Sequence, residues 1–170
     1  MNHVYAMCGV AFSGKSTIAR RIAEKLAIEL LSLDAINHQR GLSGGDGMTV
    51  AQWEETSAIA MEQLRELLLD GKSVVVDDTF SHRHLRERCN AVAEQMGARF
   101  TIVFVDTPID TTRARRAANY ARPVRPHIRD EVFERHVEGF QFPSDDEGFV
   151  RIGSEVELVT WLDQQLTPAA

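Results

Sequence analysis

The sequence has few cysteines, no long apolar run and no surplus of basic residues. Its two cysteines, Cys8 and Cys89, are too few for a disulfide framework, which favours a reducing compartment. No apolar run approaches the roughly 18 residues that cross a bilayer, and residues 1–12 lack the basic start and apolar core of a signal peptide. The formal net charge of −6 argues against strong non-specific binding to nucleic acid. We therefore expect a cytoplasmic protein that does not associate with membranes.

The rest of the composition is that of a globular chain. Hydrophobic residues make up 44% of it and charged residues 26%, so a full core is expected without disulfide bonds. No linker rich in Pro, Gly or Ser marks a boundary. These features predict a single domain over residues 1–170.

The most specific motif lies near the N-terminus. Residues 9–17, GVAFSGKST, fit the pattern G-x-x-x-x-G-K-[ST] of the phosphate-binding P-loop. An apolar run before it predicts a buried strand, and apolar spacings of four after it predict an amphipathic helix. Glycines let successive N–H groups face one anion, Lys15 reaches the β- and γ-phosphates, and the Ser16 hydroxyl binds Mg²⁺. The expected nucleotide-binding residues of the loop are Gly9, Phe12, Ser13, Gly14, Lys15, Ser16 and Thr17.

Strand and helix patterns alternate along the chain, which indicates a parallel sheet covered on both faces. The predicted strands comprise residues 4–8, 29–33, 73–77, 100–105 and 149–152. The predicted helices comprise residues 17–27, 50–70, 82–96, 109–120, 129–139 and 154–165. We expect a loop with at most a short helical turn at 35–47, a helix N-cap at Thr49 and a frayed tail at 167–170.

Acidic residues follow the predicted strands. Ligands of an open parallel sheet bind beyond the carboxyl ends of its strands. Asp34 ends the second predicted strand, and Asp77 and Asp78 end the third, so all three are candidates for the ligand site. Either Asp77 or Asp78 is expected to hold Mg²⁺ opposite Ser16, and because their side chains point to opposite faces, only one can. Asp34 is the candidate to orient a hydroxyl and accept its proton.

Arginines cluster in one region of this acidic chain. Residues 113–129 hold six of its sixteen arginines, interrupted by Pro123 and Pro126. Phosphoryl transfer needs cations that close over the phosphates and exclude water, so we predict an Arg-rich helical lid at about 109–140. Two or three of these arginines are expected to make only structural pairs, for example with Glu131 or Glu134.

Together these motifs resemble the small P-loop kinases of the polynucleotide kinase, chloramphenicol phosphotransferase and zeta-toxin type, a group often described as AAA-family ATP-binding predicted kinases. The resemblance covers residues 4–148. The nearest local similarity is to the 5′-hydroxyl kinase domain of polynucleotide kinases, which carry similar spacings from Asp78 to Arg86 and from Asp106 to Arg115. The resemblance implies that the acid matching Asp34 activates the acceptor hydroxyl and that the lid arginine matching Arg115 contacts the transferred phosphate.

The sequence also departs from polynucleotide kinases. Asn37 stands where they tend to place an arginine for the substrate's 3′-phosphate, and Arg40 is offset by three residues. The charge of −6 offers less of a basic channel for a strand. Both features favour a small hydroxylated acceptor, such as a metabolite or an antibiotic, and make nucleic acid a less favoured partner. A polynucleotide 5′-hydroxyl kinase and an ATP-binding regulatory module without an acceptor remain the alternatives.

We therefore predict an ATP- and Mg²⁺-dependent kinase with a three-layer α/β P-loop NTPase fold. Its five-stranded parallel sheet is expected in the order 2-3-1-4-5. The expected catalytic residues are Lys15, Asp34 and Arg115, and the cations closing on ATP are Arg115, Arg116, Arg122 and Arg125. The residues expected to contact the acceptor are Asp34, Asn37, His38, Arg40 and Trp53. Packing in the core is an alternative role for Trp53.

Overall fold

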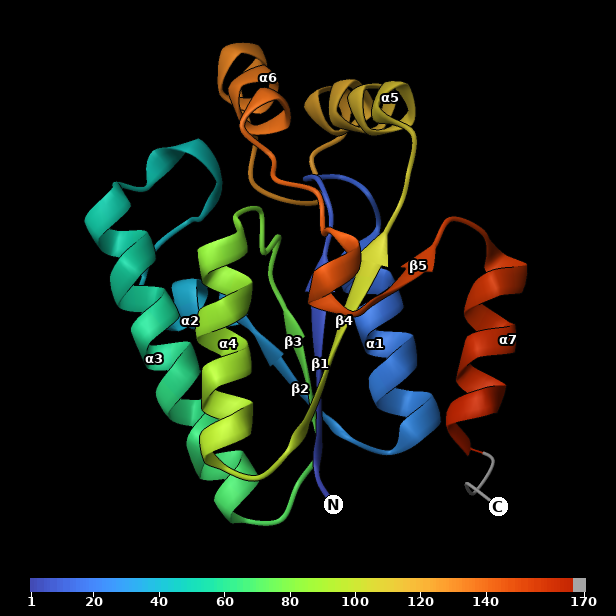
Figure 1. Ribbon diagram of the computed structural model, residues 1–170. Helices are drawn as coiled ribbons and strands as arrows, with labels where there is room; N and C mark the ends of the chain where they lie inside the picture. Colours follow the sequence, from blue (N-terminus) through green and yellow to red (C-terminus); the bar gives the residue numbers. More distant parts are fainter. Residues whose placement is uncertain (167–170) are drawn as a thin grey trace.

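The computed structural model describes residues 1–166 and forms one parallel sheet of five strands (Figure 1). The strand order is β2-β3-β1-β4-β5, which confirms the predicted fold and order. The strands are β1 (His3–Cys8), β2 (Glu29–Ser32), β3 (Val74–Asp77), β4 (Arg99–Val105) and β5 (Phe149–Ile152). The tail predicted to fray, 167–170, lies outside the described residues.

Helices cover both faces of the sheet, and two more lie over its carboxyl edge (Figure 1). They are α1 (Lys15–Leu26), α2 (Leu33–Gln39), α3 (Val50–Leu69), α4 (Arg83–Gln95), α5 (Ile109–Ala121), α6 (Asp130–Glu138) and α7 (Glu155–Leu166), with 3-10 turns η1 (Gly45–Gly47) and η2 (Asp145–Glu147). Helices α3 and α4 pack in one core cluster, α1 and α7 in the other. None of the helices in the described part of the chain is both long and apolar enough to cross a membrane.

The inner strand β3, which lies between β2 and β1, shows why the sheet is buried on both faces. Val74, Val75 and Val76 are all fully buried. Successive side chains of a strand point to opposite faces, so Val74 and Val76 join the core under α3 and α4 while Val75 joins the core under α1. Such a continuous β-branched run is typical of a parallel strand covered on both sides.

The main difference from the predicted elements is α2. The second strand ends at Ser32, one residue earlier than predicted, and α2 (Leu33–Gln39) extends into residues 35–47, where we expected a loop with at most a short helical turn. The Ser32 side chain accepts a hydrogen bond from the amide of Ala35 at 3.4 Å and so acts as the N-cap, while Leu33 and Ile36 are buried. Asp34 therefore lies in the first turn of α2 and does not end β2, which corrects its predicted placement.

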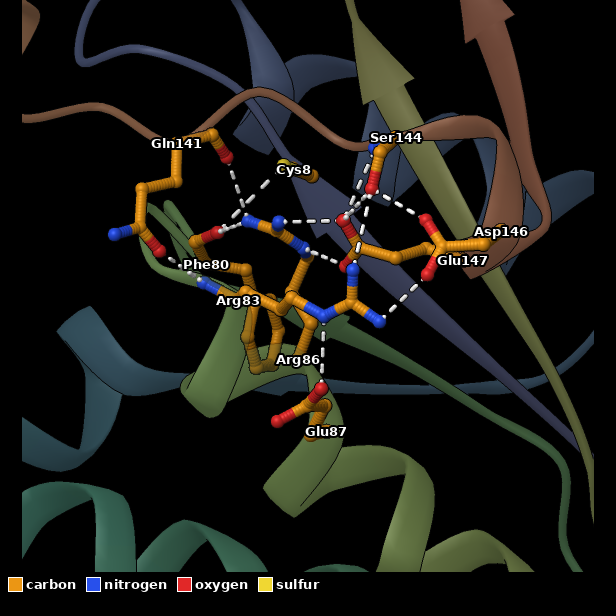
Figure 2. Close-up of polar contacts among 9 residues, drawn as sticks. All are labelled: Cys8, Phe80, Arg83, Arg86, Glu87, Gln141, Ser144, Asp146 and Glu147. Atoms are coloured by element: carbon orange, nitrogen blue, oxygen red, sulfur yellow. Dashed lines mark hydrogen bonds and ion pairs between the residues drawn. The ribbon is translucent and has the colours of Figure 1, made fainter.

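A buried arginine fixes α4 to the chain around the carboxyl edge. The guanidinium of Arg86, which is 1% exposed, holds both oxygens of Glu147 at 2.6 and 2.8 Å (Figure 2). It also donates to the backbone oxygens of Phe80 at 2.8 Å and Gln141 at 2.9 Å. These contacts join α4 to the segment after β3 and to the segment before β5, and the hydrogen bonds from Arg86 hold the pKa of Glu147 below its usual value.

We expect Arg86→Ala to lower the free energy of unfolding by about 3 kcal/mol, because it leaves the buried carboxylate of Glu147 without its partner. Urea denaturation followed by circular dichroism measures the change. Arg88→Ala is the matched control, since Arg88 lies on the same helix and is exposed. Equal midpoints for the two variants would contradict the anchoring role of Arg86.

Candidate active site

The loop between β1 and α1 has the conformation of a phosphate-binding cradle. Gly9 and Gly14 adopt φ angles of 155° and 99°, which side chains other than glycine rarely accept. A Cβ on Gly9 would come within 2.9 Å of the Ser13 hydroxyl and of the Val105 carbonyl oxygen. The Ser13 hydroxyl is buried without a hydrogen-bond partner among the described residues. The loop thus presents free polar groups at the N-terminus of α1, where anions are stabilised.

Lys15 is the buried cation of this site. It is 7% exposed, and its ammonium donates to the Val10 carbonyl oxygen at 3.0 Å. Burial lowers the pKa of Lys15 to about 8, while the charges of Asp77 and Asp78 act in the opposite direction. A buried cation facing a cavity favours a bound anion.

The structure separates the two acids after β3. Burial raises the pKa of Asp77, against the opposing effects of a hydrogen bond from Ser16 and the charge of Lys15. Its Oδ1 atom is buried without a hydrogen-bond partner among residues 1–166. Asp78 instead accepts a hydrogen bond from the amide of Phe80 at 3.2 Å. Asp77 and Ser16 together offer the hard oxygen ligands that Mg²⁺ takes alongside phosphate oxygens, so these residues fit the ion.

A cavity of about 770 Å³ joins this loop to the space between α3, α4 and α6. Lys15, Ser16 and Asp77 line one part of it, and Asp34 of α2 lines it too. The charge of Asp34 acts to raise the pKa of Asp77, so the two carboxylates are near each other. Further lining residues are Trp53, Glu54, Ser57 and Met61 of α3, His84, Leu85 and Arg88 of α4, and Val132, Phe133 and His136 of α6.

Of the four residues expected beside Asp34, only Trp53 lines the cavity. Asn37 is 1% exposed and accepts a hydrogen bond from the Thr56 hydroxyl at 2.5 Å. Arg40 pairs with the carboxylate of Glu55 and donates to the backbone of α3, and His38 is exposed. Because α2 forms a helix, Asn37 and Arg40 turn toward α3 and connect the two helices, which corrects their expected position at an acceptor.

The lid arginines divide into two groups. Arg115 donates to the carbonyl oxygens of Phe12 at 3.1 Å and Ser13 at 3.0 Å, directly on the loop. The guanidinium of Arg125 lies 4.5 Å from the centre of the Phe12 ring and lines the cavity. Both cations are therefore beside the cradle.

The other lid arginines hold the lid together. Arg116 forms an ion pair of 2.5 Å with Asp130, and Arg113 pairs with Glu134 at 2.8 Å, so α5 is tied to α6. Arg122, expected near ATP, is exposed at the end of α5. Arg113 thus makes the structural pair with Glu134 that was expected of some lid arginines, whereas Arg116, expected to close on ATP, pairs with Asp130.

Sequence reasoning missed His136. Its Nε2 atom accepts a hydrogen bond from the amide of Ala11, inside the loop, at 3.1 Å. Burial is the main reason why the pKa of His136 is lowered to about 4. The two residues are 125 positions apart, and no motif in the sequence connects them.

A glycine-rich loop between the first strand and first helix of a 2-3-1-4-5 parallel sheet defines the class of P-loop NTPases. Residues 4–143 match the AAA domain family AAA_33, and the chain belongs to this family. No curated protein sequence matches the chain.

Solved structures share the fold over nearly the whole chain. A candidate kinase from Chloroflexus aurantiacus j-10-fl is 17% identical with a TM-score of 0.79, over 98% of this chain and 99% of that one. APS kinase CysC of Mycobacterium tuberculosis, solved with AMPPNP and APS, is 20% identical with a TM-score of 0.69, over 98% of both chains. A gluconokinase from Sinorhizobium meliloti 1021 is 18% identical with a TM-score of 0.69, over 96% and 93%. Because these sequence identities are 20% or lower, the comparison shows that the chain shares the fold of these proteins.

We expect Asp77→Asn to weaken binding of Mg²⁺ in the presence of AMPPNP about tenfold or more, because it removes the negative charge of the carboxylate beside Ser16. Titration of Mg²⁺ against a fluorescent nucleotide analogue measures the effect. Asp78→Asn is the control, since an amide oxygen can still accept from the Phe80 amide. A larger loss of Mg²⁺ affinity in Asp78→Asn would reverse our assignment.

Proposed function

We propose that the protein is an ATP-dependent kinase that transfers the γ-phosphate to a hydroxyl group of a small molecule. The observation that carries this proposal is the shared cavity, which brings the phosphate cradle with Lys15 and Ser16 together with the carboxylate of Asp34. A site that only binds or hydrolyses nucleotide has no need of an adjoining cavity lined by a further carboxylate.

The donor half of the site consists of the loop amides, Lys15, Ser16 and Asp77. The amides and Lys15 would bind the phosphate oxygens, and Ser16 with Asp77 would hold Mg²⁺. A bound Mg²⁺ supplies neutralising charge to the phosphates. The contacts of Arg115 and Arg125 with the loop support a role of these cations in stabilising the charge of the transition state.

The acceptor half begins at Asp34. Its carboxylate would orient the acceptor hydroxyl and accept its proton as the hydroxyl oxygen bonds to the γ-phosphorus and the bond to the bridging oxygen of ADP breaks. Trp53 and Phe133 provide apolar walls for the body of the acceptor. Closure by α5 and α6 would exclude water and so limit hydrolysis of ATP.

The packing of Asn37 supports a small acceptor over a polynucleotide. This position, where polynucleotide kinases tend to carry an arginine for the 3′-phosphate, is buried against Thr56. The proteins of similar fold include an APS kinase, solved with AMPPNP, and a gluconokinase. Their names support the use of a nucleotide and of a small acceptor by this chain.

Nucleotide consumption tests the function. We expect slow release of ADP from ATP alone and much faster release when a pool of sugars, polyols, hydroxy acids and aminoglycosides is added. Equal rates with and without acceptors would favour the regulatory ATPase. Fast transfer to an oligonucleotide with a 5′-hydroxyl, with the steep salt dependence of strand binding, would favour the polynucleotide kinase.

Asp34→Asn is expected to keep nucleotide affinity and to lower the rate of phosphoryl transfer at least about a hundredfold, because the amide cannot accept the proton. Single-turnover transfer at saturating ATP measures it. Glu54→Gln is the control, since it removes another carboxylate from the same cavity and should cost far less. Unchanged turnover in Asp34→Asn would remove Asp34 from the mechanism.

Lys15→Ala is expected to abolish transfer, because Lys15 is the only lysine among the described residues that line the cavity. Lys25→Ala removes a lysine from the far end of the same helix, where it pairs with Asp163 at the surface, and should leave the rate unchanged. Initial rates of ADP formation compare the two. A Lys15→Ala enzyme with nearly normal transfer would overturn the P-loop assignment.

A further inference from the structure

A side chain of α6 accepts a hydrogen bond from a backbone amide inside the P-loop. Ala11 lies between the two glycines of the loop, and its N–H donates to the Nε2 atom of His136 on α6 at 3.1 Å. P-loop amides bind phosphate oxygens, which are acceptors. The imidazole lone pair is also an acceptor, so a phosphate oxygen that bound the Ala11 N–H would have to replace Nε2.

The surroundings of His136 fix its state in this conformation. Because Nε2 accepts, the ring is neutral and carries its proton on Nδ1. The Phe140 ring stands edge-on to it at 5.7 Å, and the pKa is lowered to about 4 by burial and by the charges of Lys15, from the loop, and His82, from the segment before α4. His136 is therefore neutral near pH 7 when no anion balances these cations.

A phosphate oxygen and the Nε2 lone pair cannot both take the Ala11 N–H. They would also repel each other, because each presents electron density. Either the lid moves the ring away or Nε2 gains a proton and becomes a donor. The ring stands in the same cavity as Lys15 and Asp34, at the boundary between the cradle and the acceptor space.

We propose that His136 gives up the Ala11 amide to the phosphate and then binds the transferred phosphoryl group as an imidazolium, donating from Nε2. This proposal rests on the proposed function and assigns a lid residue to it beyond the arginines. A bound phosphate adds negative charge beside the ring and an acceptor for Nε2, and both favour the protonated imidazole. A charge-assisted hydrogen bond then joins the lid to the group that is transferred.

Calorimetry of AMPPNP binding with Mg²⁺, in two buffers of different ionisation enthalpy, counts the protons taken up. Near pH 6.5 we expect the wild type to take up about one proton more per bound nucleotide than His136→Gln does. The affinity of the wild type relative to His136→Gln should rise as the pH falls from about 8 to 6. Transfer by His136→Gln should be about a hundredfold slower, as for the loss of a donor to a developing charge.

His127→Gln is the matched control, because His127 also belongs to the lid but packs against the Tyr120 ring at 4.8 Å. It should take up protons as the wild type does. Binding with equal proton uptake in the wild type and His136→Gln would overturn this proposal alone, and tighter AMPPNP binding by His136→Gln at every pH would show that the histidine only blocks the cradle. Absence of AMPPNP binding by the wild type would overturn the proposed function as well.

Discussion

A buried ammonium, that of Lys15, is the constraint on which the site depends. Lys15 is the first residue of α1, directly after the glycine-containing loop that follows β1, and burial lowers its pKa to about 8. The carboxylates of Asp77 and Asp78 keep it charged. Because the parallel sheet sends every strand toward one edge, these acids reach the cation from the neighbouring strand, and the lid helices close over the same point (Figure 1).

Local patterns of the sequence were enough to predict the parallel sheet and the phosphate-binding loop. The valines of β3 and the motif at residues 9–17 depend on neighbours along the chain, and both the strand order and the family match what they predicted. The errors arose where distant contacts decide. Asn37 and Arg40 contact Thr56 and Glu55 of α3, and His136 was missed because its partner Ala11 is 125 positions away.

The helices α5 and α6 make two kinds of contact, ion pairs with each other and weaker contacts with the phosphate-binding loop. The ion pairs Arg113–Glu134 and Arg116–Asp130 join α5 to α6. We therefore expect the two helices to move together when a contact with the loop changes. Its contacts with the cradle are hydrogen bonds from Arg115 and to His136, and a ring contact of Arg125. These contacts with the loop can be replaced by contacts with phosphate oxygens at a small cost in free energy. The ion pairs between α5 and α6 can stay intact meanwhile.

The central claim is that the phosphate cradle and Asp34 serve one transfer reaction. Following the fate of the label from γ-labelled ATP, in the presence of a pool of hydroxylated small molecules, tests it most directly. The account predicts that the wild type places the label on an organic acceptor and that this product disappears with Asp34→Asn, while nucleotide binding remains. Label found only as inorganic phosphate, whatever acceptor is supplied, would contradict it.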